Sequence, residues 1–333
     1  MEKLLLIGID TRSMLNSALK LNYTIYSTSY FSTSDTPIIE NQKIILKEED
    51  GVSCGVFEDK FNSENILEIS RDYLDEVDYI IPISGISPSD FSKGHKKKIL
   101  GNKNVKDIEN KYNFYEKIKD EFLTPMTFNV IDIDEAFEIS KNYQNIQFNK
   151  GEFILQEYVS GINLSSSVLA SKDSAKTIMN SRLLTINDFE KNNSFIYVGN
   201  ILPLTKKSIM ANVKDINKIN DKMTNTSQDL AEKFKLIGSN GVDYILNENG
   251  LYVIEMNPRL QGTFECVEKS LGINMLNAHI KACFGEIIEI PKAQYYSYKK
   301  IICNINCTAP GCCTFDLADN NCIGVNGYSP FYV

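Results

Sequence analysis

Short hydrophobic runs alternate with helical patterns over the first hundred residues. Leu4–Ile9 is apolar, the run TIYSTSY at residues 24–30 is rich in β-branched and aromatic residues, and VDYIIPISG at residues 77–85 is apolar up to its glycine. Between them, Arg12–Leu21 and Ile66–Leu74 carry apolar residues at helical spacing. This β-α-β order predicts a parallel sheet with crossover helices.

The carboxyl ends of the strands are where such a sheet binds ligands. We therefore expect Asp10, Thr11 and Arg12, together with Ser84–Ile86, to face a cleft. No GxGxxG pattern follows the first strand, and this argues against a dinucleotide site.

The segment NVKDIENKYNFYEKIKDEF at residues 104–122 predicts one helix. Lys111 falls on the side of its apolar stripe. The ammonium can reach water along the core surface, or it can point into a cleft toward a phosphate, and the pattern alone favours the first. The expected stripe comprises Val105, Ile108, Tyr112, Tyr115, Ile118 and Phe122.

A second group of β runs follows. Phe153–Tyr158, FILQEY, predicts a strand, and the runs SSSVLAS, AKTIMNSRLL and FIYVGNILPL with polar turns between them predict an antiparallel meander. Ile219–Phe234 is polar enough to predict an exposed helix.

The run GVDYILNENGLYVIEMN at residues 241–257 predicts a β-hairpin whose three-residue loop is Glu248-Asn249-Gly250. With this loop Asn247 faces Leu251 and Asp243 faces Glu255. Opposed residues share a face, and alternation adds Asn257 to that face, whereas Ile254 and Met256 point the other way.

Two carboxylates and an amide oxygen on one face repel each other unless a cation lies between them. Hard oxygen ligands of this kind suit Mg²⁺, which takes one or two carboxylates and fills its other positions with phosphates and water. The alternative is a solvated β face with incidental acids. Because Tyr252 and Val253 indicate a packed strand, the pattern favours the metal site.

Composition narrows the function. A chain of 333 residues is long enough for two or three domains that share a cleft. The net charge of −8 and the pI near 5.1 argue against a nucleic-acid partner, which needs a basic stripe. No window approaches the ~20 apolar residues of a membrane helix, and the N-terminal apolar run is too short for a signal peptide. We expect a soluble, cytoplasmic protein without a membrane partner.

Cysteines crowd the end of the chain, where a metal or cluster is one interpretation. An intracellular protein keeps its thiols reduced, and this segment has neither CxxC pairs nor a nearby histidine, so the pattern favours free thiols. The residues are Cys303, Cys307, Cys312, Cys313 and Cys322.

The segment GVDYIL followed by LYVIEMNPRLQGTFECVE resembles the metal-binding segment of the ATP-grasp superfamily, as found in biotin carboxylase and carbamoyl phosphate synthetase. The resemblance implies that Asp243, Glu255 and Asn257 bind Mg²⁺, with Mn²⁺ as a substitute, that bridges the ATP phosphates. It also implies that Arg259 contacts the reacting phosphate or carboxylate.

Other segments are similar in the same order. The helix around ENKYNFYEKIKDEF would give Lys111 a phosphate contact. This differs from the interpretation that the pattern alone favours, in which the ammonium reaches water along the core surface. The run MNSRLL with FIYVGNILPL is similar to an archaeal carboligase-like branch that includes tyramine glutamate ligase, which puts Arg182, Tyr197 and Asn200 near the substrate. The hinge strand FILQEYVSG would hold adenine at Gln156, Glu157, Tyr158 and Val159, with Asn163 near the ribose where many relatives have a glutamate.

The resemblance also predicts the organisation of the chain. We expect a Rossmann-like N-terminal domain over residues 1–100, followed by a two-lobed α+β ATP-grasp fold with a small lobe at 101–152 and a large lobe at 153–291. The segment 292–333 forms a cysteine-rich tail. Relatives carry a second phosphate-binding lysine and a glycine-rich lid before the hinge strand. Here the interval before the hinge strand contains a single glycine, Gly151, with Lys150 beside it. Its shortness favours a segment omitted from the sequence over a protein without a lid.

The implied activity is ATP- and Mg²⁺-dependent ligation of a small-molecule carboxylate to an amine or thiol. Lys111, Arg182 and Arg259 would be catalytic, the intermediate would be an acyl phosphate, and archaeal cofactor biosynthesis would be the setting. The resemblance also allows a homo-oligomer. One alternative is an ATP-binding homologue without catalysis, with a regulatory role. Another is a redox or metal-handling protein that uses the tail cysteines.

Overall fold

The computed structural model describes residues 1–32, 35–46, 63–130, 135–136, 139, 146–148, 153–185, 188, 197–209, 211 and 213–293. The lid interval around Lys150 and the five tail cysteines lie wholly or largely outside these residues. Predictions about them therefore stay predictions.

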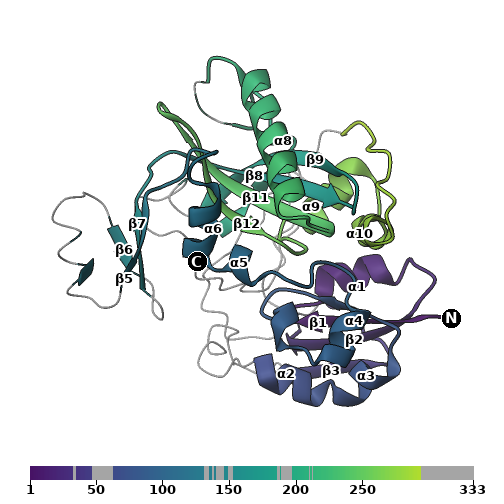
Figure 1. Ribbon diagram of the computed structural model, residues 1–333. Coiled ribbons are helices and arrows are strands. Elements are labelled where there is room, and N and C mark those ends of the chain that lie inside the picture. The colour runs from purple at the N-terminus through teal and green to yellow at the C-terminus, as the bar shows by residue number, and fades with distance from the viewer. Residues whose placement is uncertain are drawn as a thin grey trace, which may run out of the picture.

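The N-terminal unit is built on a four-stranded parallel sheet of order β3-β2-β1-β4 (Figure 1). The prediction of a parallel sheet is confirmed, although β3 was not foreseen. Its strands are β1 (Lys3–Gly8), β2 (Thr24–Phe31), β3 (Gln42–Leu46) and β4 (Tyr79–Pro82). Its helices are α1 (Arg12–Ala18), α2 (Ser63–Ile69), α3 (Arg71–Glu76) and α4 (Lys93–Lys98), with a short 3-10 turn at Pro88–Asp90.

Strand β1 is buried on both faces, as a central parallel strand must be. Leu4 and Leu6 pack into the core shared with α1 and the large lobe, whereas Leu5 and Ile7 pack into the core on the other face. The single helix expected at Ile66–Leu74 is two helices, because the chain breaks at Ser70, whose Oγ donates to the carbonyl of Ile66 at 2.6 Å.

The helix expected at residues 104–122 is also broken, into α5 (Lys106–Glu109) and α6 (Lys111–Ile118). Asn110 ends the first and caps the second by accepting a hydrogen bond from the amide of Asn113 at 2.9 Å. The break rotates the buried stripe, so Phe114 is buried and Tyr112 is only half-buried.

The small lobe contains a three-stranded antiparallel sheet of order β5-β7-β6 that projects away from the rest of the molecule (Figure 1). The strands are β5 (Thr127–Val130), β6 (Ile146–Phe148) and β7 (Phe153–Glu157). Strand β7 corresponds to the predicted hinge strand FILQEY and is followed directly by the first strand of the large lobe.

The large lobe is an antiparallel sheet of order β10-β9-β8-β11-β12. The predicted meander is confirmed by β8 (Ile162–Ala170), β9 (Ala175–Thr185) and β10 (Tyr197–Ile201). The hairpin is β11 (Gly238–Asn247) and β12 (Gly250–Asn257), and the helices are α8 (Ile216–Lys233), α9 (Phe264–Leu271) and α10 (Met275–Cys283).

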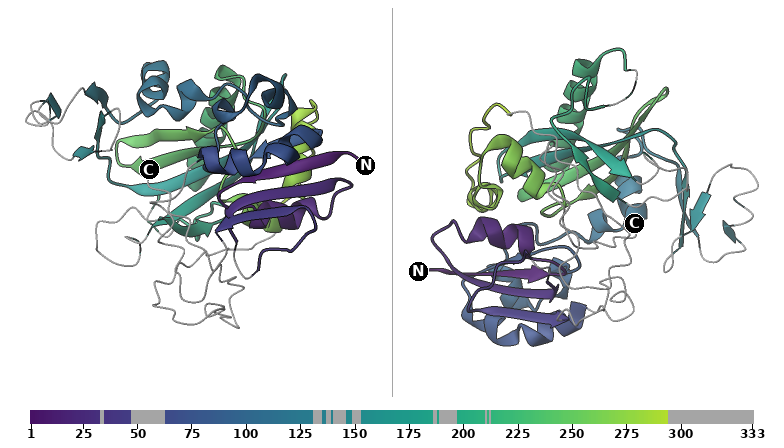
Figure 2. Two further views of the ribbon diagram at one scale, coloured as in Figure 1. Left: turned by 90° about the horizontal axis from the view of Figure 1, so that it is seen from below. Right: turned by 180° about the vertical axis from the view of Figure 1, so that it is seen from behind.

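Helix α8 lies across one face of the five-stranded sheet, while α9 and α10 lie between the sheet and the N-terminal unit (Figures 1 and 2). The prediction of an exposed α8 was wrong for one of its faces. Met223, Leu230 and Ala231 are buried against β8 and β11, because helical spacing brings these few apolar residues onto one side.

The N-terminal unit and the large lobe meet at Arg12. Its buried guanidinium contacts Glu265 of α9 at 2.9 Å and Asp35 at 3.1 Å. Arg12 thus lies at the carboxyl end of β1, as predicted, but it faces the large lobe and is paired with carboxylates. Ile86, expected to face a cleft, is instead buried in the core of the N-terminal unit.

Candidate functional site

The β11–β12 hairpin carries the candidate site, and its turn differs from the prediction. Asn247 pairs with Gly250, so the loop is the two residues Glu248 and Asn249, and the expected pairing of Asn247 with Leu251 was wrong. Gly250 has φ +140°, a conformation that favours glycine at the end of a tight turn.

A β-bulge corrects the register before the acids are reached. Tyr244 pairs with Val253, but Asp243 pairs with Glu255, so Ile254 is the extra residue on β12. The opposition of Asp243 and Glu255 is therefore as predicted, although it results from a shorter turn plus a bulge. Without the bulge, Glu255 would point to the face covered by α8.

The two acids and the amide converge on the face of the sheet opposite α8. Asn257 Nδ2 donates to Asp243 Oδ2 at 3.1 Å and to Glu255 Oε1 at 3.2 Å. Ser165 of β8, directly opposite Asp243, donates its hydroxyl to Asp243 Oδ1 at 2.6 Å. Met256 points the other way, into the core beneath α8, as predicted.

The electrostatics of this face favour a bound cation. Burial and then the charge on Glu255 raise the pKa of Asp243 to about 7, against the opposing effects of the Ser165 hydrogen bond and Arg259. Burial also opposes ionisation of Glu255, but the charge of Lys111, the hydrogen bond from Asn257 and the charge of Arg259 together lower its pKa. One acid is therefore readily ionised, and the other resists a second negative charge beside it.

Lys111 is the first residue of α6, and its ammonium lies 3.4 Å from Glu255 Oε2. Both side chains are partly exposed, at 24% and 22%. The ammonium therefore lies over the face of the sheet that carries Asp243, Glu255 and Asn257, here called the acidic face. It does not extend along the core surface to water. The α5–α6 break at Asn110 sets this direction, since it starts a new helix at Lys111.

Arg259 follows the acidic face on the loop after β12. Its charge acts on both Asp243 and Glu255, yet within the described part of the chain its guanidinium forms no hydrogen bond or ion pair. A half-buried cation with open donors beside the acids is suited to an anionic ligand.

Gln261 fixes the same loop against the sheet. Its carboxamide lies over Gly241 so closely that a Cβ on Gly241 would fall 1.6 Å from the carboxamide carbon. Thr263 and Ser167 contribute weak hydroxyl contacts to its Oε1, at 3.3 Å and 3.5 Å. Gly241 is therefore required by close packing rather than by its φ angle.

The residues present fit Mg²⁺. Two carboxylates with an amide oxygen form a hard donor set, and the Asn257 Nδ2 now lies where it contacts both acids. Rotation of that amide by half a turn would direct its Oδ1 toward a cation. This candidate site has only two acids, since its third ligand is an amide. Within the described residues, no metal site is formed by three or more histidine, cysteine, aspartate or glutamate side chains.

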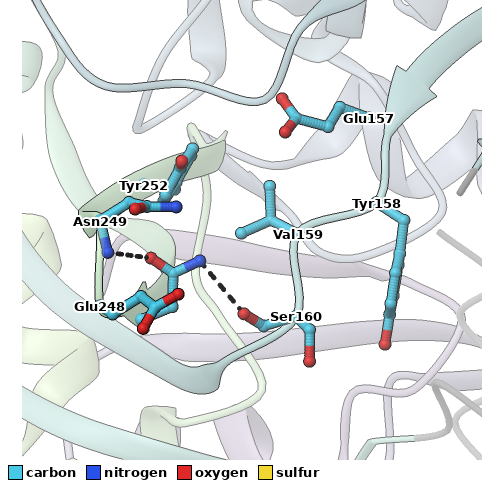
Figure 3. Close-up of a pocket in the computed structure, with 8 residues that line it drawn as sticks. Glu157, Tyr158, Val159, Ser160, Glu248, Asn249 and Tyr252 are labelled. Carbon is cyan, nitrogen blue, oxygen red and sulfur yellow. Dashed lines mark hydrogen bonds between the residues drawn. The ribbon is translucent and has the colours of Figure 1, made fainter. Parts of the chain in front are cut away.

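A pocket of about 470 Å³ lies on the same side of the sheet, between the hinge segment after β7 and the tip of the hairpin (Figure 3). Asn247 Nδ2 donates to the carbonyl of Ser160 at 3.2 Å and bridges the two walls. Tyr252 and Glu255 lie on this face opposite Ile245 and Asp243, which are two residues or about 7 Å apart along β11 at ~3.3 Å per residue. The lining residues are Glu157, Tyr158, Val159, Ser160, Asn247, Glu248, Asn249 and Tyr252.

The predicted nucleotide residues divide into two groups. Glu157, Tyr158 and Val159 line this pocket. Gln156 does not, because its Nε2 donates to the hydroxyl of Thr127 in β5 at 2.9 Å. Asn163 is half-buried on β8, paired with Ile245, and is not among the lining residues.

The predicted substrate residues also divide. Arg182 lies on the α8 side of the sheet, where its guanidinium donates to the carbonyl of Ile209 and pairs with Asp188. Tyr197 and Asn200 are hydrogen-bonded to each other on the acidic face, and Asn200 donates to Ser181 at 3.2 Å. Burial, followed by the nearby Cys266 and Asp243, raises the pKa of Tyr197.

Ser165, Gly241 and Gln261 are site residues that the sequence analysis did not single out. Ser165 could have been found by extending the strand pairing to β8, whose alternate residues must face Asp243. The packing of Gly241 beneath Gln261 has no signal in local sequence, since it joins two segments only through the fold.

The described residues contain no helix with the length and apolar character that crossing a bilayer requires.

Comparison with known proteins agrees with this geometry. Residues 108–263 match a family model described as an ATP-grasp domain. A protein of Methanocaldococcus jannaschii, itself uncharacterized, is 26% identical over 322 residues, which cover 91% of this chain and 81% of that protein. Tyramine–L-glutamate ligase of the same organism is 30% identical over 164 residues, 48% of this chain and 46% of that enzyme.

Solved structures show the same fold. The biotin carboxylase domain of the Hydrogenobacter thermophilus 2-oxoglutarate carboxylase, in complex with MgADP, ADP and bicarbonate, has a TM-score of 0.62 at 14% identity, and the match covers 89% of this chain and 72% of that chain. The family match spans the hinge strand, the acids and Arg259. Together, the family match and the shared fold identify an ATP-grasp domain in this chain over residues 108–263.

Proposed function

We propose that this protein is an ATP- and Mg²⁺-dependent ligase that joins a small-molecule carboxylate to an amine. The observation that carries the proposal is the convergence of Asp243, Glu255 and Asn257 beneath two cations, Lys111 and Arg259. Phosphoryl transfer needs positioning and charge neutralisation more than it needs a nucleophilic side chain. This face supplies both.

Each residue has a role in the proposal. Asp243, Glu255 and Asn257 would hold Mg²⁺, which when bound supplies positive charge to the β- and γ-phosphates. Lys111 adds a second positive charge from the α6 side and leaves Glu255 as the phosphates arrive. The adenosine part would occupy the pocket at Glu157–Ser160, since that pocket lies on the acidic face at a distance that the triphosphate can bridge.

Arg259 would bind the substrate carboxylate through its open guanidinium donors. Attack of that carboxylate on the γ-phosphate forms an acyl phosphate and releases ADP. The amine then attacks the acyl carbon, loses a proton and releases inorganic phosphate. Lys111 and Arg259 stabilise the developing negative charges in these steps, and no covalent bond to the protein forms.

An amine as the second substrate is supported by the similarity to tyramine–L-glutamate ligase, whose name specifies a glutamate acid and a tyramine amine. We therefore propose C–N bond formation, with an amino-acid carboxylate as the first acid to test.

The test begins with isothermal titration of ADP with and without Mg²⁺. Wild-type protein should bind ADP more tightly with Mg²⁺, and Asp243→Asn and Glu255→Gln should each remove that difference. Asp221→Asn, on the exposed side of α8, is the matched control and should bind as wild type does. Metal-independent binding by the wild type would refute the proposed site.

Turnover is tested by phosphate release from MgATP in the presence of L-glutamate paired with a panel of primary amines. The expected result is phosphate release that requires both partners and a product mass equal to their sum minus water. Release that occurs with ATP alone, and is unchanged by any acid or amine, would contradict ligation.

A further inference from the structure

Asn102 connects three distant segments next to the candidate metal site. It lies in the segment between α4 and α5 that joins the N-terminal unit to the lobes, and it is 9% exposed. Its Nδ2 donates to Asn240 Oδ1 at 2.7 Å and to the carbonyl of Pro258 at 2.8 Å, while its Oδ1 accepts from the amide of Ile237 at 2.8 Å. Both Nδ2 hydrogens and one Oδ1 lone pair are therefore used.

The partners of Asn102 adjoin the proposed ligands. Pro258 lies between Asn257 and Arg259 in the chain, and Asn240 precedes Gly241, which pairs with Asn257 across the hairpin. Asn240 is itself held by donation of its Nδ2 to the carbonyl of Gly238 at 2.9 Å. Asn102 thus clamps the outer end of the hairpin, where β12 stops and the Arg259 loop begins.

We propose that Asn102 is a positioning residue for the metal site. It does not touch the cation; it holds the carbonyl of Pro258 and through it the backbone that orients Asn257 and Arg259. This inference rests on the proposed function of Asp243, Glu255 and Asn257 as metal ligands. Groups that orient metal ligands typically contribute a 10–100-fold effect on metal affinity.

Only an asparagine satisfies all of these partners. Aspartate has the same shape and can still accept from Ile237, but it has no hydrogen for the carbonyl of Pro258. It would also place its charge against Asn240 Oδ1. Alanine leaves the carbonyl of Pro258 and the amide of Ile237 buried without their partners, and such groups carry a cost.

The segment that carries Asn102 is itself anchored. The ring of His279 packs against Gly101 and Gly238, where a Cβ on Gly238 would fall 2.5 Å from the ring. His279 also accepts from the amide of Ser239 at 2.8 Å. A displacement of the N-terminal unit would therefore be transmitted through Asn102 to the end of β12.

The experiment measures the gain in ADP affinity that Mg²⁺ provides, as the ratio of the Kd in EDTA to the Kd at saturating Mg²⁺. In Asn102→Ala the ratio should fall by about tenfold, with the Kd in EDTA unchanged. Asn102→Asp should show the same loss while it retains the contact to Ile237. The melting temperature of each variant, recorded by circular dichroism, establishes that it is folded.

Asn274→Ala is the matched control. Asn274 is also an asparagine that joins two units, because its Nδ2 donates to the carbonyl of Ser17 at 2.8 Å, but it does not bond to the hairpin. It should lose stability and keep the wild-type affinity ratio. An unchanged ratio in folded Asn102→Ala and Asn102→Asp would overturn the inference alone, whereas a wild type without any Mg²⁺ gain would overturn the proposed function together with it.

Discussion

The ammonium of Lys111 lies 3.4 Å from Oε2 of Glu255, so the N-terminus of α6 contacts strand β12 across the acidic face. The pair is partly exposed on both sides, and its attraction is screened by water. Its importance is therefore positional, since the cation is held where a nucleotide's phosphates would meet the acids.

Replacement of Lys111 by methionine should weaken ADP binding about tenfold, equal to about 1.4 kcal/mol, because one phosphate contact and its charge are lost. Isothermal titration checks this. Lys117→Met is the control, since Lys117 lies on the same helix but pairs with the exposed Asp107 at 2.6 Å. Equal nucleotide affinity in both variants would return Lys111 to a structural role.

Gly241→Ala should distort the site. The added methyl would overlap the Gln261 carboxamide, and overpacking of this kind typically costs about 1–3 kcal/mol. Denaturant unfolding should show this loss, and Mg²⁺-dependent ADP binding should weaken with it. Gly262→Ala, where the new methyl would meet only Tyr197 at 4.0 Å, should leave both quantities near wild type.

Arg182→Met should destabilise the fold without changing nucleotide affinity. The Arg182 and Asp188 side chains are 11% and 20% exposed, and removal of one partner of a largely buried pair costs about 3 kcal/mol. Chemical unfolding and ADP titration on the same preparation separate the two effects. A selective loss of ligase activity in a protein of normal stability would revive the substrate role that its sequence context implied.

His279 should make stability depend on pH. Burial lowers the pKa of His279 from 6.5 to about 4, despite its contact with the carbonyl of Leu100. Between these two pH values His279 is protonated in the unfolded chain but neutral in the folded protein. The free energy of unfolding therefore falls as the pH drops from 6.5 toward 4. Between pH 7 and pH 5 the expected loss is roughly 2 kcal/mol.

The measurement is unfolding free energy at pH 7 and pH 5, compared with His279→Asn. The asparagine Oδ1 can still accept from the amide of Ser239, but it does not titrate, so the extra loss at pH 5 should disappear. Cys283, 3.7 Å from the ring, remains a neutral thiol throughout this range because burial raises its pKa to about 12. Identical losses in wild type and variant would contradict the assignment.

The sequence was sufficient for features that depend on strand alternation. It predicted the parallel N-terminal sheet, the meander and the convergence of Asp243, Glu255 and Asn257, because each follows from a period of two or from β-α-β order. It failed where side chains interrupt regular structure. The breaks at Ser70 and Asn110 depend on polar groups that satisfy backbone partners, and such residues also occur in unbroken helices.

Contacts between distant segments could not be predicted from local pattern. Arg182 follows Ser181 on β9, and a single residue step decides whether a side chain meets the acids or α8. The sequence also gave no reason to link Asn102 with Pro258, since they are 156 residues apart. These contacts come from the arrangement of three units around one hairpin.

Because of the bulge at Ile254, the opposition of Asp243 and Glu255 does not depend on one particular turn length. A three-residue turn without a bulge and a two-residue turn with one both bring Asp243 opposite Glu255. With the number of residues between the acids unchanged, a relative can therefore lengthen the turn by one strand residue and lose the bulge together with no effect on the acids, whereas either change alone would turn Glu255 toward α8. In alignments of such proteins, the sequence distance between the two acids should be preserved more strictly than the position of the turn between them.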